Sequence, residues 1–165
     1  MTTLPNSRQT HLLIVIAVIG LISYALYSQY VDGLEPCPLC MTQRFFFILI
    51  GLFSFICLFH QRPRWYASLG VIASIGGIAS AGRQVWLQHL PPELVPACGP
   101  SLQYMLETFP LSDTLRTLIT GDGNCAEVLW QLFGFSMPEW SLACFLGFMA
   151  VSVWQIVREQ PATKL

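Results

Sequence analysis

Charged residues are scarce in this sequence. Asp, Glu, Lys and Arg make up 10% of its 165 residues, whereas hydrophobic residues make up 54%. Because a soluble domain carries roughly 25% charged residues, this deficit excludes an ordinary soluble protein and indicates an integral membrane protein. The formal net charge of −1 gives no basic surface for a polyanion, so no nucleic acid partner is expected.

A signal-peptide cleavage site is also missing. Arg8 precedes the first apolar run, as it would in a signal peptide, but no small-x-small pattern follows that run. The tetrapeptide Tyr24-Ala25-Leu26-Tyr27 is a poor cleavage site. We therefore interpret the first run as a membrane span, with a signal peptide as the alternative.

Four long apolar segments are present, and each approaches the ~20 residues that cross a bilayer core. They cover residues 12–29, 41–59, 65–87 and 140–157. The third is rich in Gly, Ala and Ser, which let helices approach closely in lipid. The sequence predicts an all-α fold: an integral membrane four-helix bundle that forms a single membrane domain over residues 1–165.

The distribution of charge predicts the orientation of the spans. Basic residues flank one end of the bundle, with one acidic neighbour in the C-terminal tail: Arg8, Arg62, Arg64, Arg158 and Lys164, with Glu159. Acidic residues dominate the connections at the other end. Because positive residues stay in the cytoplasm, both termini and the short turn are expected there, as residues 1–11, 60–64 and 158–165. The loops 30–40 and 88–139 are expected to face outward.

This topology sorts the six cysteines into three pairs. One pair is a CxxC motif at the outer start of the second span, one lies in the long outer loop, and one lies inside the second and fourth spans: Cys37 and Cys40, Cys98 and Cys125, Cys57 and Cys144. A CxxC motif is a redox couple or half of a metal site. The third pair is expected to behave as small hydrophobic residues.

The CxxC motif is placed to make one thiol acidic. Pro38 suits the first helical position, which puts Cys37 near the N-cap and Cys40 in the first turn of the helix. Free amides and the positive end of the helix dipole stabilise a thiolate there. Arg44 follows Cys40 at i+4, on the same helix face. The alternative is a structural disulfide, with the Arg44 side chain merely extending to the membrane surface.

The long outer loop contains a helical pattern between its two cysteines. Apolar residues recur there at helical spacing: Leu111, Leu115, Leu118 and Ile119. Ser112, Asp113 and Thr114 offer capping groups at the start. This pattern predicts a short amphipathic helix, which either lies on the outer membrane surface or docks against the bundle. A disulfide between Cys98 and Cys125 could be structural, although the exposed, irregular surroundings favour an exchangeable bond.

The whole pattern resembles the disulfide bond formation protein B (DsbB) family of inner-membrane thiol oxidases. The resemblance covers the four spans, the CxxC motif followed by Arg44, the two loop cysteines, and a characteristic stretch after them. That stretch runs from Gly121-Asp122-Gly123-Asn124-Cys125-Ala126-Glu127 through Trp130 and Phe133-Gly134 to Met137-Pro138-Glu139-Trp140. The resemblance implies a multi-pass protein of the bacterial inner membrane, with its active cysteines in the periplasm.

The resemblance also implies a redox relay. Cys98 and Cys125 would form the loop disulfide that oxidises a soluble periplasmic dithiol protein of the DsbA type, with Cys98 forming the mixed disulfide. Cys37 and Cys40 would then reoxidise the loop pair. The implied enzyme is a protein-disulfide oxidoreductase that supports disulfide bond formation. The DsbA–DsbB–quinone system keeps the bacterial periplasm oxidising.

A membrane quinone is the implied electron acceptor. Cys40 would pass two electrons to ubiquinone, or to menaquinone, with Arg44 beside the ring. His89 matches a position linked to the quinone site in this family, and a histidine there could exchange protons near neutral pH. No metal ion is expected.

Three alternatives compete with this interpretation. A vitamin K epoxide reductase-like enzyme also couples a CxxC motif to a quinone, but there the motif lies near the start of the last span. A metal-binding membrane protein would use Cys37, Cys40, Cys98, Cys125 and His89 as ligands. A passive scaffold would hold two structural disulfides. Thiol trapping separates these possibilities, because a relay pair accumulates as thiols when quinone is exhausted.

Overall fold

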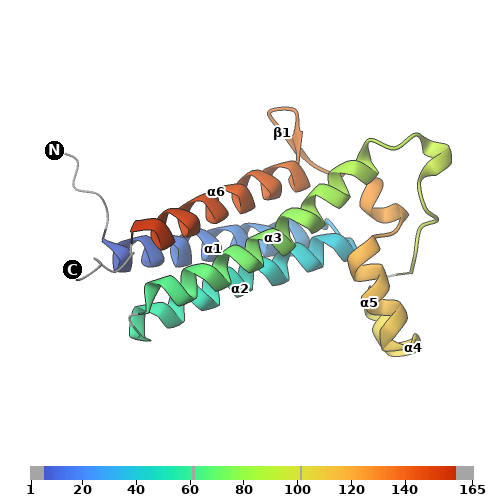
Figure 1. Ribbon diagram of the computed structural model, residues 1–165. Coiled ribbons are helices and arrows are strands. Elements are labelled where there is room, and N and C mark those ends of the chain that lie inside the picture. The colour runs from blue at the N-terminus through green and yellow to red at the C-terminus, as the bar shows by residue number, and fades with distance from the viewer. Residues whose placement is uncertain (1–5, 61, 101, 159–165) are drawn as a thin grey trace, which may run out of the picture.

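Four long helices form the body of the computed structural model, which describes residues 6–60, 62–100 and 102–158 (Figure 1). They are α1 (Ser7–Tyr30), α2 (Pro38–His60), α3 (Pro63–Gln88) and α6 (Met137–Arg158). Each is long and apolar enough to cross a membrane, so the predicted all-α multi-pass fold is confirmed. Glu159 and Lys164, which entered the charge argument, lie outside the described residues.

Small residues let α3 pack closely between α2 and α6. A β-carbon at Gly76 would overlap the Phe46 ring of α2, and one at Gly77 would overlap the Phe145 ring of α6. The Phe145 ring stacks on Phe47 with centroids 4.0 Å apart and planes 7° apart. The glycines therefore bring the three helices into contact around one aromatic core, while α1 packs on α2.

All the shorter elements lie at one end of the bundle, which we call the cysteine end. It is the end where α2 begins and α3 ends (Figure 1). The elements are the 3₁₀ turns η1 (Pro92–Leu94) and η2 (Gly123–Ala126), the helices α4 (Leu102–Thr108) and α5 (Leu111–Thr120), and the strands β1 (Gln131–Leu132) and β2 (Phe135–Ser136). The strands pair antiparallel as a small hairpin. Neither α4 nor the hairpin was predicted, because each is too short to show a clear hydrophobic period.

The predicted loop helix is present as α5, but its expected cap is wrong. The helix begins at Leu111 after Pro110, without a side-chain cap, so Ser112, Asp113 and Thr114 lie within its first turn. Thr114 is buried and directs its hydroxyl toward backbone oxygens. The Pro110 carbonyl accepts from the Asp113 and Thr114 amides instead, and a proline at this position offers no side-chain acceptor for a cap.

Helix α5 docks on the bundle and still exposes an apolar face. The Thr42 hydroxyl of α2 donates to the Leu118 carbonyl at 2.7 Å, and the Arg83 Nε of α3 donates to the Thr120 carbonyl at 3.1 Å. Leu111, Leu115 and Ile119 are exposed. The helix lies across the bundle axis in Figure 1, an orientation that suits an amphipathic helix at a membrane interface.

Candidate functional site

The CxxC motif lies at the first turn of α2. The helix begins at Pro38, so Cys37 precedes it and Cys40 falls in its first turn, as the sequence predicts. The Cys37 thiol donates to Cys40 Sγ at 2.8 Å, and the Cys40 amide donates to Cys37 Sγ at 3.3 Å. No disulfide joins the described cysteines.

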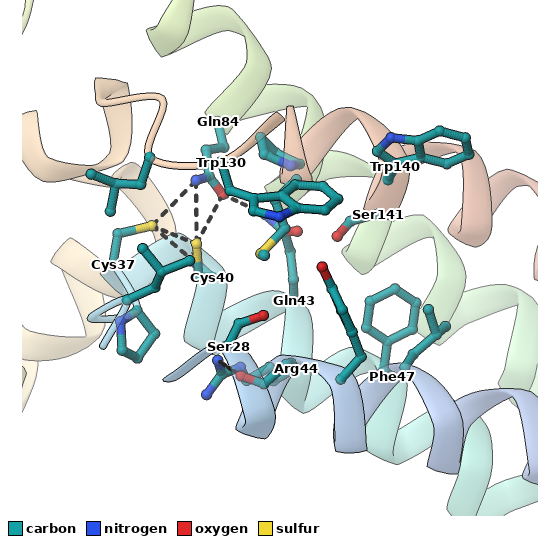
Figure 2. Close-up of a pocket in the computed structure, with 18 of the residues that line it drawn as sticks. Ser28, Cys37, Cys40, Gln43, Arg44, Phe47, Gln84, Trp130, Trp140 and Ser141 are labelled. Atoms are coloured by element: carbon teal, nitrogen blue, oxygen red, sulfur yellow. Dashed lines mark hydrogen bonds between the residues drawn. The ribbon is translucent and has the colours of Figure 1, made fainter. Parts of the chain in front are cut away.

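A glutamine that sequence analysis missed bridges the two sulfurs. Gln84 of α3 places its side-chain Nε2 3.3 Å from both Cys37 Sγ and Cys40 Sγ (Figure 2). Its Oε1 accepts a 2.7 Å hydrogen bond from Gln43 Nε2 of α2. Both amides are buried. The available signal was their position, because polar side chains inside apolar spans usually serve packing or function.

Arg44 is directed toward α1. Its guanidinium donates to Gln29 Oε1 and to the Ala25 carbonyl, the latter at 2.9 Å, and approaches Met41 Sδ at 3.9 Å. It lines the same cavity as Cys40, as the i+4 spacing predicts. The charge therefore lies on the cavity wall, whereas the Gln84 amide makes the hydrogen-bonding contact with the sulfurs.

Turn η2 brings the loop cysteine Cys125 against the CxxC motif. Its side chain is fully buried beside Cys37, Leu39 and Leu87. Interaction with the Cys37 side chain lowers the pKa of Cys125, with burial opposing it. Interaction with Cys125 and with Cys40 raises the pKa of Cys37. Cys125 therefore carries the more acidic thiol of the two, and both belong to one buried cluster.

Cys98 lies on the outside of the same turn. It is exposed, and a β-carbon at Gly123 would lie 3.0 Å from its Sγ. The Gly123 amide donates to the Ala97 carbonyl at 3.2 Å, and Asn124 Nδ2 donates to the Gly99 carbonyl at 3.1 Å. These two hydrogen bonds hold the irregular segment that carries Cys98 against the turn that carries Cys125.

A cavity of about 370 Å³ opens beside Cys40. Its walls come from all four long helices and from the segment before the hairpin, and they are mainly apolar. Tyr24 of α1 meets Trp130 edge-on with ring centroids 5.9 Å apart, and Figure 2 shows Trp130, Ser141 and Phe47 around the space. Such a volume, with few polar groups, suits a flat, mostly apolar ring.

Two other residues singled out from the sequence lie differently. His89 caps α3, is exposed, and holds the Val85 carbonyl through Nδ1 at 2.8 Å. It is not among the described residues that line the cavity, although its neighbour Gln88 is. Cys144, expected as an inert span residue, does line the cavity. Within residues 6–60, 62–100 and 102–158, His, Cys, Asp and Glu side chains form no metal-binding group.

Comparison with known proteins assigns the family. The family model for disulfide bond formation protein DsbB matches residues 7–155. The chain is 49% identical over 162 residues to disulfide bond formation protein B of Saccharophagus degradans, covering 96% of this chain and 98% of that protein. It is 48% identical over 157 residues to the protein of that name from Hahella chejuensis, covering 93% and 95%. Identity to disulfide bond formation protein B 1 of Pseudomonas aeruginosa is 44% over 162 residues, covering 94% and 98%.

Proposed function

The chain belongs to the disulfide bond formation protein B family, and from that premise we propose that it reoxidises a DsbA-type dithiol protein and passes the electrons to a membrane quinone. Ubiquinone is the expected acceptor, with menaquinone as the second. The observation that carries the proposal is the chain of sulfurs at the cysteine end. It runs from exposed Cys98, through buried Cys125 and Cys37, to Cys40 at the cavity wall.

The first three steps are thiol–disulfide exchanges. A thiolate of the partner protein attacks Cys98 in a Cys98–Cys125 disulfide, and Cys125 leaves as a thiolate. The second partner thiol then releases Cys98 and completes the partner's disulfide. Cys125 attacks Cys37 in a Cys37–Cys40 disulfide, so that the electron pair of the broken bond goes to Cys40. The burial of Cys125 in one cluster with Cys37 supports this route, because exchange needs direct sulfur contact.

Closing the cycle requires an electron acceptor at Cys40. Cys98 displaces Cys125 from Cys37, which restores the loop disulfide and leaves Cys37 and Cys40 as a dithiol. A quinone held in the cavity would supply the oxidising power that this dithiol needs, by taking up two electrons and two protons. Cys40 supplies the electrons and re-forms the bond to Cys37. The Arg44 guanidinium on the cavity wall would stabilise negative charge on an acceptor bound there.

The decisive experiment follows the complete reaction. Purified protein in lipid nanodiscs is mixed with a reduced DsbA-type protein and a water-soluble ubiquinone analogue, and quinone absorbance is recorded with partner oxidation. We expect one quinone to be consumed for each partner disulfide formed. A menaquinone analogue, run in parallel, identifies the preferred acceptor. Partner oxidation without loss of quinone would overturn the proposal.

We also propose that the cysteine end faces the periplasm and that both termini are cytoplasmic in the bacterial inner membrane. Arg8, Arg62, Arg64 and Arg158 all lie at the opposite end of the helices, which supports this orientation. A membrane-impermeant thiol reagent applied to intact spheroplasts should label Cys98. The Cys98→Ser variant should lose that label, and labelling only after lysis would reverse the orientation.

A further inference from the structure

The buried side-chain amides of Gln43 and Gln84 form a pair that has no role in the relay proposed above. They come from different membrane helices, and both are nearly excluded from solvent, with 4% and 3% of their surfaces exposed. Burying two primary amides in a bundle is costly unless their groups are hydrogen-bonded. One hydrogen bond joins them, and the remaining Gln84 donor is directed at the redox sulfurs.

The direction of the bond between the two glutamines sets the orientation of Gln84. Gln43 Nε2 donates to Gln84 Oε1 at 2.7 Å, which occupies the oxygen of that amide. The Gln84 amide nitrogen then faces Cys37 and Cys40, at 3.3 Å from each sulfur (Figure 2). The same Gln84 oxygen also accepts a longer hydrogen bond, at 3.6 Å, from the Cys40 thiol. Rotating the amide would replace the short donor contacts with an oxygen, so Gln43 acts as the positioning residue.

Cys40 accepts two hydrogen bonds in this arrangement, one from the Cys37 thiol and one from Gln84. Cys37 loses its proton donor as soon as it is bonded to another sulfur. At the moment when Cys125 has displaced Cys40, the Gln84 amide is the side-chain donor that remains on the leaving sulfur. Hydrogen bonds to charged groups are about twice as strong as neutral ones, so this contact strengthens as the charge appears.

From this geometry we propose that Gln84 is a catalytic hydrogen-bond donor that stabilises the Cys40 thiolate released from the Cys37–Cys40 disulfide, with Gln43 holding its amide in the donating orientation. The inference rests on the proposed function for its place in the cycle. In the step concerned, a bond forms between Cys125 and Cys37, the Cys37–Cys40 bond breaks, and Cys40 keeps the electron pair. A neutral donor suits this site because it leaves the thiolate free to give up its electrons.

Several titratable or charged groups surround the pair and affect any pH profile measured there. They are Glu35, Cys37 and Arg44 on or before α2, Asp122, Cys125 and Glu127 around η2, and Cys144 on α6. Every variant below keeps all of them. A change in the profile therefore reports the amides themselves.

The test measures thiolate formation at Cys40 without quinone or partner. Fully reduced protein in nanodiscs is alkylated with iodoacetamide across a pH series, and modification of Cys40 is read by tandem mass spectrometry. Gln84→Leu should slow Cys40 alkylation at neutral pH about tenfold, equal to about 1.4 kcal/mol. Its pH profile should move upward by about one unit. Gln43→Leu should slow alkylation about threefold, because the Gln84 amide stays present but is free to rotate.

Two further variants keep the test decisive. Gln84→Met keeps side-chain length without an N–H donor and should behave as Gln84→Leu does, even if the latter folds poorly. Gln155→Leu removes a buried glutamine of α6 whose amide has no partner among the described residues, and it should leave alkylation unchanged.

Unchanged alkylation in both Gln84 variants would overturn the inference, as would equal slowing in Gln155→Leu. Failure of the proposed function looks different: wild-type protein would not consume quinone, while the order of alkylation rates would persist.

Discussion

The two cysteine pairs lie in opposite kinds of surroundings. Cys37 and Cys40 are held where an apolar helix begins, with their sulfurs bridged by Gln84 from a second helix. Cys98 lies in an irregular loop segment and is exposed, whereas Cys125 lies in a turn and is fully buried. The first pair is restrained by the bundle, whereas the second depends on two backbone-directed hydrogen bonds.

This difference matches the partners that each pair is proposed to meet. A pair that reacts with a small, flat acceptor needs fixed geometry, because reacting atoms must be held close and aligned. A pair that reacts with another protein needs one accessible sulfur. The buried Cys125 connects the loop pair to the CxxC pair, because it lies in one buried cluster with Cys37.

Replacing Cys40 should have the largest effect. Cys40→Ser should reduce quinone consumption below detection, because Cys37 then has no CxxC partner with which to re-form a disulfide. A single round of exchange at Cys98 should survive, measured as a trapped mixed disulfide with the partner. Cys57→Ser, the same change at the far end of α2, is the control. Normal turnover in Cys40→Ser would show that the two pairs do not form a relay.

Removing the cation on the cavity wall should affect only the quinone step. Arg44→Ala should raise the KM for a ubiquinone analogue about tenfold or more, since hydrogen bonds to charged groups contribute about 1.5–3 kcal/mol. Exchange between Cys98 and the partner should keep its rate. Arg83→Ala removes a cation that is bound to Thr120 and Trp86 instead, and it should change neither. Equal losses in both half-reactions would count against a separate quinone site.

The contact between the pairs should be visible in the pH dependence of Cys125. The Cys37 thiol stabilises the Cys125 thiolate and lowers its pKa, so Cys37→Ala should raise that pKa by about one unit. Ultraviolet thiolate absorbance during a pH titration measures it. In the pH range below the ordinary pKa of a thiol, the wild-type protein should hold more Cys125 thiolate than the variant. This difference should disappear as the pH falls through the lowered pKa of Cys125. A profile that does not move would mean that the two sulfurs are not in contact.

The smallest effect is expected when the hydrogen bond between the turn of Cys125 and the segment of Cys98 is removed. Asn124→Ala removes the bond to the Gly99 carbonyl and should cost about 1 kcal/mol locally. Hydrogen exchange of the Gly123 amide should then become about fivefold faster. Asn6→Ala, at the start of α1, should leave that amide unaffected. An unchanged hydrogen-exchange rate in Asn124→Ala would show that the segment around Cys98 is held by other contacts.

Much of the fold could be predicted because lipid imposes strong local rules. A helix that spans the membrane must be long, apolar and internally hydrogen-bonded, so all four spans could be found from composition alone. The start of α2 followed from Pro38, and α5 followed from its apolar spacing. The elements that were not predicted, α4 and the hairpin, are too short to show a hydrophobic period. Their positions depend on packing at the cysteine end.

The candidate site divides in the same way. The sequence by itself determined that a CxxC motif opens a membrane helix, that Arg44 follows one turn later, and that two more cysteines lie in one loop. Only the tertiary structure decided that Cys125 lies against Cys37, that Arg44 is bound to α1, and that Gln84 contacts both redox sulfurs. Helix starts and spacings are set by neighbouring residues. A contact between Cys40 and a residue 44 positions away depends on which helices pack together and in what register.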